Sequence, residues 1–129
     1  MADKPLEPTA EAALTTGFPS PAADYAARRL DLNDLLVRHP VATFFWRAQG
    51  AAMQADGIHH NDILIVDRAL TATPGHIVIV CLNGESLVRR LRSRQGRFVL
   101  QAGPVIEPLA EDSDMEIWGV VTYVIHPCI

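Results

Sequence analysis

Serine hydroxyls are the first side chains of this 129-residue chain that suggest covalent chemistry, and there are four of them: Ser20, Ser86, Ser93 and Ser113. A serine attacks a carbonyl only when a neighbouring base accepts its proton. In serine–lysine enzymes that base is a buried lysine, but Lys4 is the only lysine here. Arginine cannot replace it, because a guanidinium with a pKa above about 12 stays protonated. We therefore interpret the serines as turn or strand residues.

The basic residues concentrate in one segment, Glu85–Arg92, which reads ESLVRRLR. Alternate side chains of a β-strand share a face, so Arg89 points with its leucine neighbours, toward the interior or a cleft. Further arginines follow at 90, 92, 94 and 97. This cluster is typical of the solvated face of a hairpin, and contact with DNA phosphate or an acidic partner is the alternative.

Two adjacent histidines, His59 and His60, lie near Asp56 and Asp62. Adjacent histidines on a turn rarely converge on one ion. The sequence therefore predicts a surface loop here, with no metal and no cofactor. Cys81 and Cys128 have no metal-type CxxC spacing and are compatible with reduced thiols.

These residues must be positioned by a fold, and the strand-like segments and turn signals in the sequence predict one that is mainly antiparallel β. Residues 1–27 are rich in proline and predict an extended, flexible N-terminal arm, and residues 28–129 predict a folded domain. Asp31–His39 predicts a short helix, capped by Asp31 and stopped by Pro40. Asn83-Gly84 is a strong hairpin signal. The expected strands are Thr43–Ala48, Ile63–Val66, His76–Leu82, Glu85–Arg92, Arg97–Gln101 and Glu116–Ile125.

Composition limits the functions available to the chain. A hydrophobic content of 49% over 129 residues is enough for one core. The formal net charge of −4 argues against a general nucleic-acid binder. No apolar run of about 18 residues is present, and the first ten residues lack the apolar core of a secretory signal. We expect a cytoplasmic protein without membrane contact.

The last predicted strand is apolar on both faces. Strict alternation places Ile117, Val121 and Tyr123 on one face and Trp118 on the other. One face is expected to cover the core and the second to bind a partner, so these four residues are candidates for a homodimer interface. Coverage by the arm or by a loop is the alternative.

Four segments carry recognisable motifs: GFPSPAADY at Gly17–Tyr25, DLNDLLVRHP at Asp31–Pro40, GI..NDILIVDRALTAT at Gly57–Thr73 and WGVVTYVIHP at Trp118–Pro127. Together they resemble the UmuD-like branch of the LexA/UmuD group of S24 self-cleaving proteins. The resemblance covers most of the chain from Gly17 onward. It implies a LexA/UmuD C-terminal-type, β-clip-like fold. The room before the first strand is too short for the DNA-binding domain of a repressor.

The resemblance also assigns site positions, and three of them depart from the pattern. Within Arg47–Asp67, RAQGAAMQADGIHHNDILIVD, the family's nucleophilic serine falls on Ala52, between Gly50 and Met53. Its lysine base falls on Arg89. Its scissile bond falls on Thr16–Gly17, where the family has Cys or Ala before the glycine. Losing both members of a nucleophile–base pair removes the chemistry, so the sequence predicts a pseudopeptidase. An engineered Ser→Ala form is the alternative.

The resemblance implies a function without cleavage. UmuD-like proteins are dimeric accessory subunits of Y-family, UmuC-like translesion polymerases in the SOS response, and RecA filaments and replicative polymerase subunits are further partners. This chain would then be an inactive accessory subunit that keeps its arm. A second hypothesis is an antagonist that forms mixed dimers with an active UmuD-like protein or occupies RecA.

Overall fold

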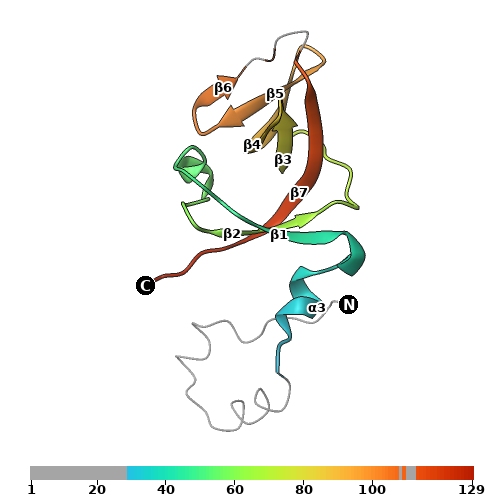
Figure 1. Ribbon diagram of the computed structural model, residues 1–129, viewed down its shortest axis with the longest axis vertical. Helices are drawn as coiled ribbons and strands as arrows, with labels where there is room; N and C mark the ends of the chain where they lie inside the picture. Colours follow the sequence, from blue (N-terminus) through green and yellow to red (C-terminus); the bar gives the residue numbers. More distant parts are fainter. Residues whose placement is uncertain (1–28, 108, 110–112) are drawn as a thin grey trace. The chain divides into compact units, whose positions relative to one another are not determined.

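The computed structural model describes residues 29–107, 109 and 113–129. The chain divides into two compact units, Met1–Leu35 and Leu36–Ile129. The predicted cleavage bond, Thr16–Gly17, lies outside the described residues, and so does the predicted arm. Within the second unit the strands form one antiparallel sheet, which confirms the predicted fold class (Figure 1). The strands are β1 (Thr43–Arg47), β2 (Ile63–Asp67), β3 (Ile77–Leu82), β4 (Glu85–Arg94), β5 (Arg97–Ala102), β6 (Val105–Glu107) and β7 (Met115–Ile125).

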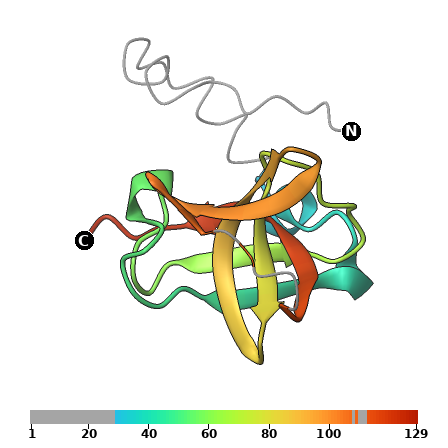
Figure 2. The same cartoon turned by 90° about the horizontal axis from the view of Figure 1, so that it is seen from above.

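The order across the sheet is β1-β2-β7-β3-β4-β5-β6. The last strand in the chain, β7, is therefore an inner strand that pairs with β2 on one side and β3 on the other. Figure 1 and Figure 2 show β7 running from the β1–β2 part of the sheet to the part formed by β3, β4 and β5. The edges belong to β1 and β6.

Two hairpins build the β3–β4–β5 part of the sheet. Asn83 and Gly84 connect β3 to β4 with φ angles of 51° and 86°, and Gln95 and Gly96 connect β4 to β5 with 55° and 76°. Two consecutive residues with positive φ are the requirement of a type I′ turn, whose twist matches that of the strands it joins. The first hairpin confirms the Asn-Gly prediction. The short strand β6 was not predicted.

The helix is shorter than predicted. It spans Leu32–Leu36 (α3), and the Asp31 side chain accepts a hydrogen bond from the Asn33 backbone N–H at 3.0 Å, as expected of a cap. A separate 3₁₀ turn, η1, covers Pro40–Ala42. His39 has φ −125° and ψ 84°, because the residue before a proline is driven out of the α region. The helical pattern therefore ends before His39. In the described residues no helix is long and apolar enough to cross a membrane.

The sheet carries two groups of buried side chains. The first core cluster lies toward β1 and the loop that follows it, and comprises Ala48, Met53, Ile58, Leu64, Val66, Ile79 and Ala102. The second core cluster lies between β3, β4, β5 and β7, and comprises Val78, Val80, Leu91, Leu100 and Val120. Strand β7 contributes to both, which explains why it is apolar on both faces.

The faces of β7 do not follow strict alternation, and this corrects the sequence prediction. Trp118 and Val121 pack against the first core cluster, whereas Ile117 packs against the second. Register shifts opposite β3 and β2 leave one extra residue in β7 at each place, Trp118 and Thr122. Each bulge reverses the sidedness of the residues beyond it in the strand. A pattern of period two cannot show where these reversals fall.

Candidate functional site

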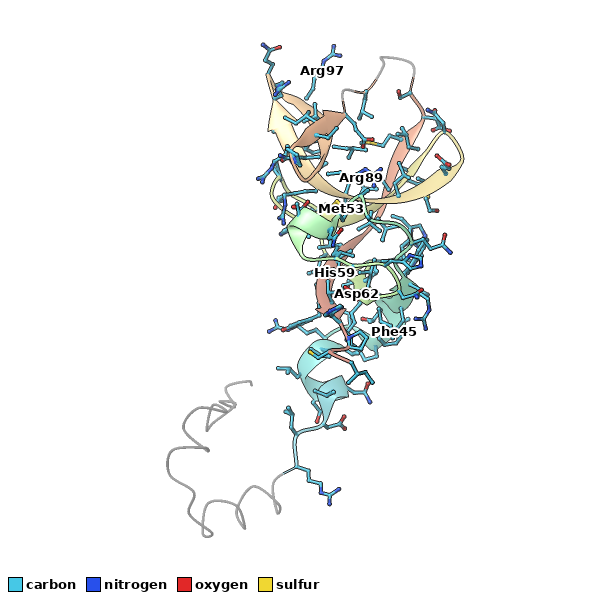
Figure 3. All side chains as sticks on the ribbon, turned by 90° about the vertical axis from the view of Figure 1, so that its left-hand side faces the viewer. Phe45, Met53, His59, Asp62, Arg89 and Arg97 are labelled. Atoms are coloured by element: carbon cyan, nitrogen blue, oxygen red, sulfur yellow. The ribbon has the colours of Figure 1, made fainter. Side chains whose placement is uncertain are left out.

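A pocket of about 440 Å³ opens between the loop after β1 and the strands β3 and β4. Its apolar wall is continuous with the first core cluster, and its polar groups include the side chains of Arg47 and Arg89. Figure 3 shows Met53 and Arg89 close together in this part of the sheet. The lining residues are Trp46, Arg47, Ala48, Gln49, Gly50, Ala52, Met53, Ile58, Ile79, Ser86, Leu87, Val88 and Arg89.

The loop that carries Ala52 is fixed at both ends. Gly50 has φ 86°, a conformation that favours glycine, and its N–H donates to the His60 ring at 2.9 Å. The Met53 side chain is 4% exposed and anchors the loop in the first core cluster. A 3₁₀ turn, η2 (Gln54–Asp56), follows, and Met53 O accepts the N–H of Ile58 at 3.1 Å. Ala52 itself is exposed on the pocket wall.

Arg89 reaches the same pocket from β4, on the side opposite the loop. Its side chain is 14% exposed, so the charge is largely withdrawn from water. The Nε group donates to Glu107 Oε1 at 2.8 Å and Nη1 donates to the Val88 carbonyl at 2.7 Å. The charge is therefore balanced by a carboxylate of the short strand β6.

The pocket brings together the positions predicted as a former nucleophile–base pair, but not the groups that such a pair needs. Ala52 ends in a methyl group, and the guanidinium of Arg89 has no lone pair to accept a proton. Ser86 also lines the pocket, and its hydroxyl lies 3.9 Å from Cys81 Sγ. Arg89 cannot activate that hydroxyl either. Hydroxyl attack from position 52 and proton abstraction by position 89 are therefore chemically excluded.

A second ion pair supports the loop from the side of β4. Arg90 Nε donates to Asp56 Oδ1 at 3.0 Å, and the other oxygen of Asp56 accepts the Gly103 N–H at 2.8 Å. Arg90 Nη1 also donates to the Gly75 carbonyl at 2.7 Å. These bonds connect η2 with β4 and with the turn between β5 and β6. Arg89 and Arg90 are thus paired and partly buried, contrary to the predicted solvated face.

Two buried carboxylates carry shifted pKa values. Burial raises the pKa of Asp67, but bonds from the His39 ring at 2.6 Å and the Ala69 N–H at 2.8 Å outweigh it and lower the pKa below its usual value. Burial likewise raises the pKa of Asp62, and bonds from the His59 backbone N–H and the His126 ring lower it further than burial raises it. Both side chains are therefore anions at neutral pH.

The proposed dimer residues have different surroundings. Trp118 lies edge-on to Phe44, with ring centroids 5.2 Å apart, and the Arg68 guanidinium covers its ring at 4.3 Å. Ile117 and Val121 are also partly buried within the sheet's own clusters. Tyr123 is 40% exposed and shares a row across the sheet, through a buried residue of β2, with Phe45, which is 61% exposed.

The fold and the pocket together define a class, an antiparallel β domain with a cleft between a turn and a hairpin. The family model described as Peptidase S24-like matches residues 8–122, and the chain belongs to this family. The relatives place it among the UmuD-like proteins. Protein MucA of Salmonella typhimurium is 40% identical over 126 residues, covering 88% of this chain and 82% of the relative.

Two further relatives give the same assignment. Protein ImpA of Escherichia coli is 42% identical over 118 residues, covering 85% of this chain and 77% of the relative. Protein SamA of Salmonella typhimurium is 44% identical over 110 residues, covering 85% and 78%. The predicted resemblance to the LexA/UmuD group is confirmed.

Proposed function

We propose that this protein is a non-cleaving, UmuD-like accessory subunit of a Y-family, UmuC-like translesion polymerase in the SOS response to DNA damage. The observation that carries the proposal is the pairing of Ala52 and Arg89 in one pocket of an S24 domain. The pocket is present, whereas neither of the two positions carries a serine hydroxyl or a lysine amine. A protein that keeps the fold and the pocket but lacks the reactive groups can still bind partners, and binding is therefore the function we propose.

Self-cleavage would need a hydroxyl and a base at these two positions, and restoring only one of them restores little. Glu107 adds a third obstacle. A lysine placed at position 89 would lie beside this carboxylate, which would raise the lysine pKa and hold it protonated. The bond Thr16–Gly17 therefore stays intact in this proposal, and the arm remains attached.

The active assembly is proposed to be a homodimer in the cytoplasm. The exposed aromatic row of Tyr123 and Phe45 supports an interface on this face of the sheet. The other β7 candidates, Ile117, Trp118 and Val121, pack against the protein's own core clusters. The partners are a Y-family polymerase and the RecA filament, with replicative polymerase subunits as further candidates. The net charge of −4 agrees with partners that are proteins rather than DNA read by sequence.

The chemistry is tested by rebuilding the pair in a chain that also carries Thr16→Ala, so that the cleavage bond fits the family pattern. The series is Ala52→Ser alone, Ala52→Ser with Arg89→Lys, and the same pair with Glu107→Gln. Ala52→Ser with Arg90→Lys is the matched control, since it adds a lysine one residue away. Cleavage after position 16 is followed by mass spectrometry with activated RecA.

We expect no cleavage for Ala52→Ser alone or for the control, slow cleavage at high pH for the pair, and faster cleavage at lower pH once Glu107 is neutralised. Cleavage of the unmodified chain would refute the proposal. Cleavage of Ala52→Ser with Arg89 in place would favour the engineered form of an ordinary peptidase. Failure of every variant would refute the assignment of Ala52 and Arg89 to the catalytic positions.

The partners are tested by affinity capture from lysate of the DNA-damaged host, with intact-mass analysis of the captured protein. A Y-family polymerase recovered with the uncut chain is the expected result. Recovery of an active UmuD-like protein or RecA without polymerase would replace the proposal with the antagonist.

A further inference from the structure

A second group of reactive side chains lies outside the pocket, where the loop 58–62 meets the end of β7. His59 and Asp62 come from the loop, and His126 follows the last residue of β7 (Figure 3 labels the first two). Each offers one nitrogen or oxygen atom, and these atoms all lie within 4.8 Å of one another. We propose that His59, Asp62 and His126 form a binding site for a divalent transition-metal ion of the zinc class.

Asp62 is placed as the central ligand. Its side chain is completely buried, and Oδ1 lies 2.7 Å from His126 Nδ1. Its other oxygen, Oδ2, accepts the backbone N–H of His59 at 2.7 Å, which orients the carboxylate toward both rings. Carboxylates that bind a metal ion in proteins are usually oriented by a hydrogen bond of this kind.

His59 provides the observation that points to a ligand. Its Nδ1 atom is buried and has no hydrogen-bond partner among the described residues. The carboxylate oxygen Asp62 Oδ2 is 3.7 Å away, which is too far for a hydrogen bond. A buried nitrogen without a partner is destabilising, because it has lost its water without gaining a hydrogen bond. An ion bound between the ring and the carboxylate would use this lone pair.

The distances suit a small tetrahedral ion. Zinc lies about 2.0–2.2 Å from imidazole nitrogen and carboxylate oxygen, so two ligands of one ion are about 3.3 Å apart. The two nitrogen–oxygen distances, 2.7 Å for His126 and 3.7 Å for His59, lie on either side of that value. The two rings lie with their centroids 4.6 Å apart and tilted by 30°. Small ring movements would complete three bonds.

The chemical types of the three ligands indicate which ion would bind, and the solvent exposure of the two histidines leaves a fourth coordination position open. Two imidazoles and one carboxylate favour zinc and its neighbours over calcium or magnesium, which prefer oxygen. The side chains of His59 and His126 are 41% and 48% exposed, so water can reach the fourth position. The sequence could not predict this site, because His126 is 64 residues from Asp62.

The site is connected to the pocket through the backbone. Ala48 N–H donates to the Asp62 carbonyl and Asn61 N–H donates to the Ala48 carbonyl, both at 2.8 Å. His60, between the two loop ligands, accepts the Gly50 N–H. An ion that fixes the loop 58–62 to the end of β7 would therefore also stiffen the pocket edge.

The test is isothermal titration of the chelator-treated full-length protein with Zn²⁺, with Co²⁺ absorption as a second probe of the ligands. His126→Ala is the principal variant, since His126 lies beyond the strand and is exposed, and His59→Ala is the second. His60→Ala is the matched control on the same loop. Cys128→Ser excludes binding by the exposed thiol two residues after His126.

We expect one Zn²⁺ per chain, a loss of affinity of at least about 100-fold in His126→Ala and His59→Ala, and unchanged affinity in the two controls. The Co²⁺ spectrum should lack the thiolate charge-transfer band. Absence of Zn²⁺ binding by the unmodified protein would overturn the proposal, and so would equal binding by His126→Ala or loss in Cys128→Ser alone. Circular dichroism of each variant verifies that it is folded.

Discussion

Replacing Asp56 by alanine should destabilise the domain, and the size of the effect can be worked out from its contacts. The carboxylate is 12% exposed and accepts two hydrogen bonds, from Arg90 Nε at 3.0 Å and from the Gly103 N–H at 2.8 Å. The change leaves a partly buried guanidinium and a backbone N–H without this acceptor. It also removes the link between η2 and the β5–β6 turn.

The magnitude can be estimated bond by bond. A hydrogen bond to a charged group contributes about 1.5–3 kcal/mol, so two such bonds set a range of about 3–6 kcal/mol. Arg90 is 25% exposed and keeps its bond to the Gly75 carbonyl, so water and that carbonyl compensate part of the loss. We expect a decrease in the free energy of unfolding of about 3 kcal/mol. Domains of this size have about 5–15 kcal/mol in total.

Urea unfolding monitored by tryptophan fluorescence measures this decrease directly. Asp114→Ala, which removes an exposed carboxylate just before β7, is the matched control and should change stability by less than about 0.5 kcal/mol. Asp56→Ala, Arg90→Met and the double variant, measured together, give the coupling energy of the pair. A decrease below about 0.5 kcal/mol for Asp56→Ala would refute the reasoning, since both bonds would then contribute nothing measurable.

Three further changes test other parts of the structure. Gly119→Ala should destabilise by about 1–3 kcal/mol, because a Cβ at this position would lie 2.6 Å from a side chain of β2; unchanged urea unfolding would contradict that close approach. Asp67 has a lowered pKa in the folded state, so its contribution is present above the unfolded pKa of about 3.9 and is lost as pH falls through the folded pKa. Stability should therefore decline between about pH 5 and pH 2 by no more than about 1 kcal/mol through this pair, since solvent screens the half-exposed His39; an identical pH profile for Asp67→Asn would exclude it. Tyr123→Asp should weaken the proposed dimer at least about tenfold in sedimentation experiments, while Phe98→Asp, an exposed aromatic on β5, should not; equal dissociation constants for the two variants would remove Tyr123 from the interface.

Local signals predicted the β framework well. Asn83-Gly84 marked a hairpin because a type I′ turn needs two positive φ angles, and the structure has them. Asp31 caps the helix as predicted, but the helix ends at Leu36, before His39, which Pro40 holds out of the α region. Strand β6 has three residues, too few to show a period. The bulges at Trp118 and Thr122 depend on pairing with two other strands, which no local pattern in β7 contains.

The sequence predicted those features of the site that depend on the type of a single residue. It could not predict the ion pairs, because their two members come from segments that are far apart in the sequence. Strand alternation predicted an inward or cleft-facing Arg89, and the structure places it in the pocket. Its partner Glu107 is 18 residues away, on the strand that was missed. Asp56 and Arg90 are 34 residues apart. These pairs form only because the sheet brings η2, β4 and β6 together.

The ion pair of Arg89 with Glu107 has a consequence for the history of this lineage. With the carboxylate in place, a mutation that placed lysine at position 89 would produce a protonated side chain, and a serine at position 52 would still lack a base. Neither reversion would be selected alone, because each becomes useful only after the others have occurred. If the proposed function is correct, the ion pair therefore makes it difficult for cleavage activity to return by single mutations. The pocket residues are then free of catalytic constraints and can change in ways that favour binding.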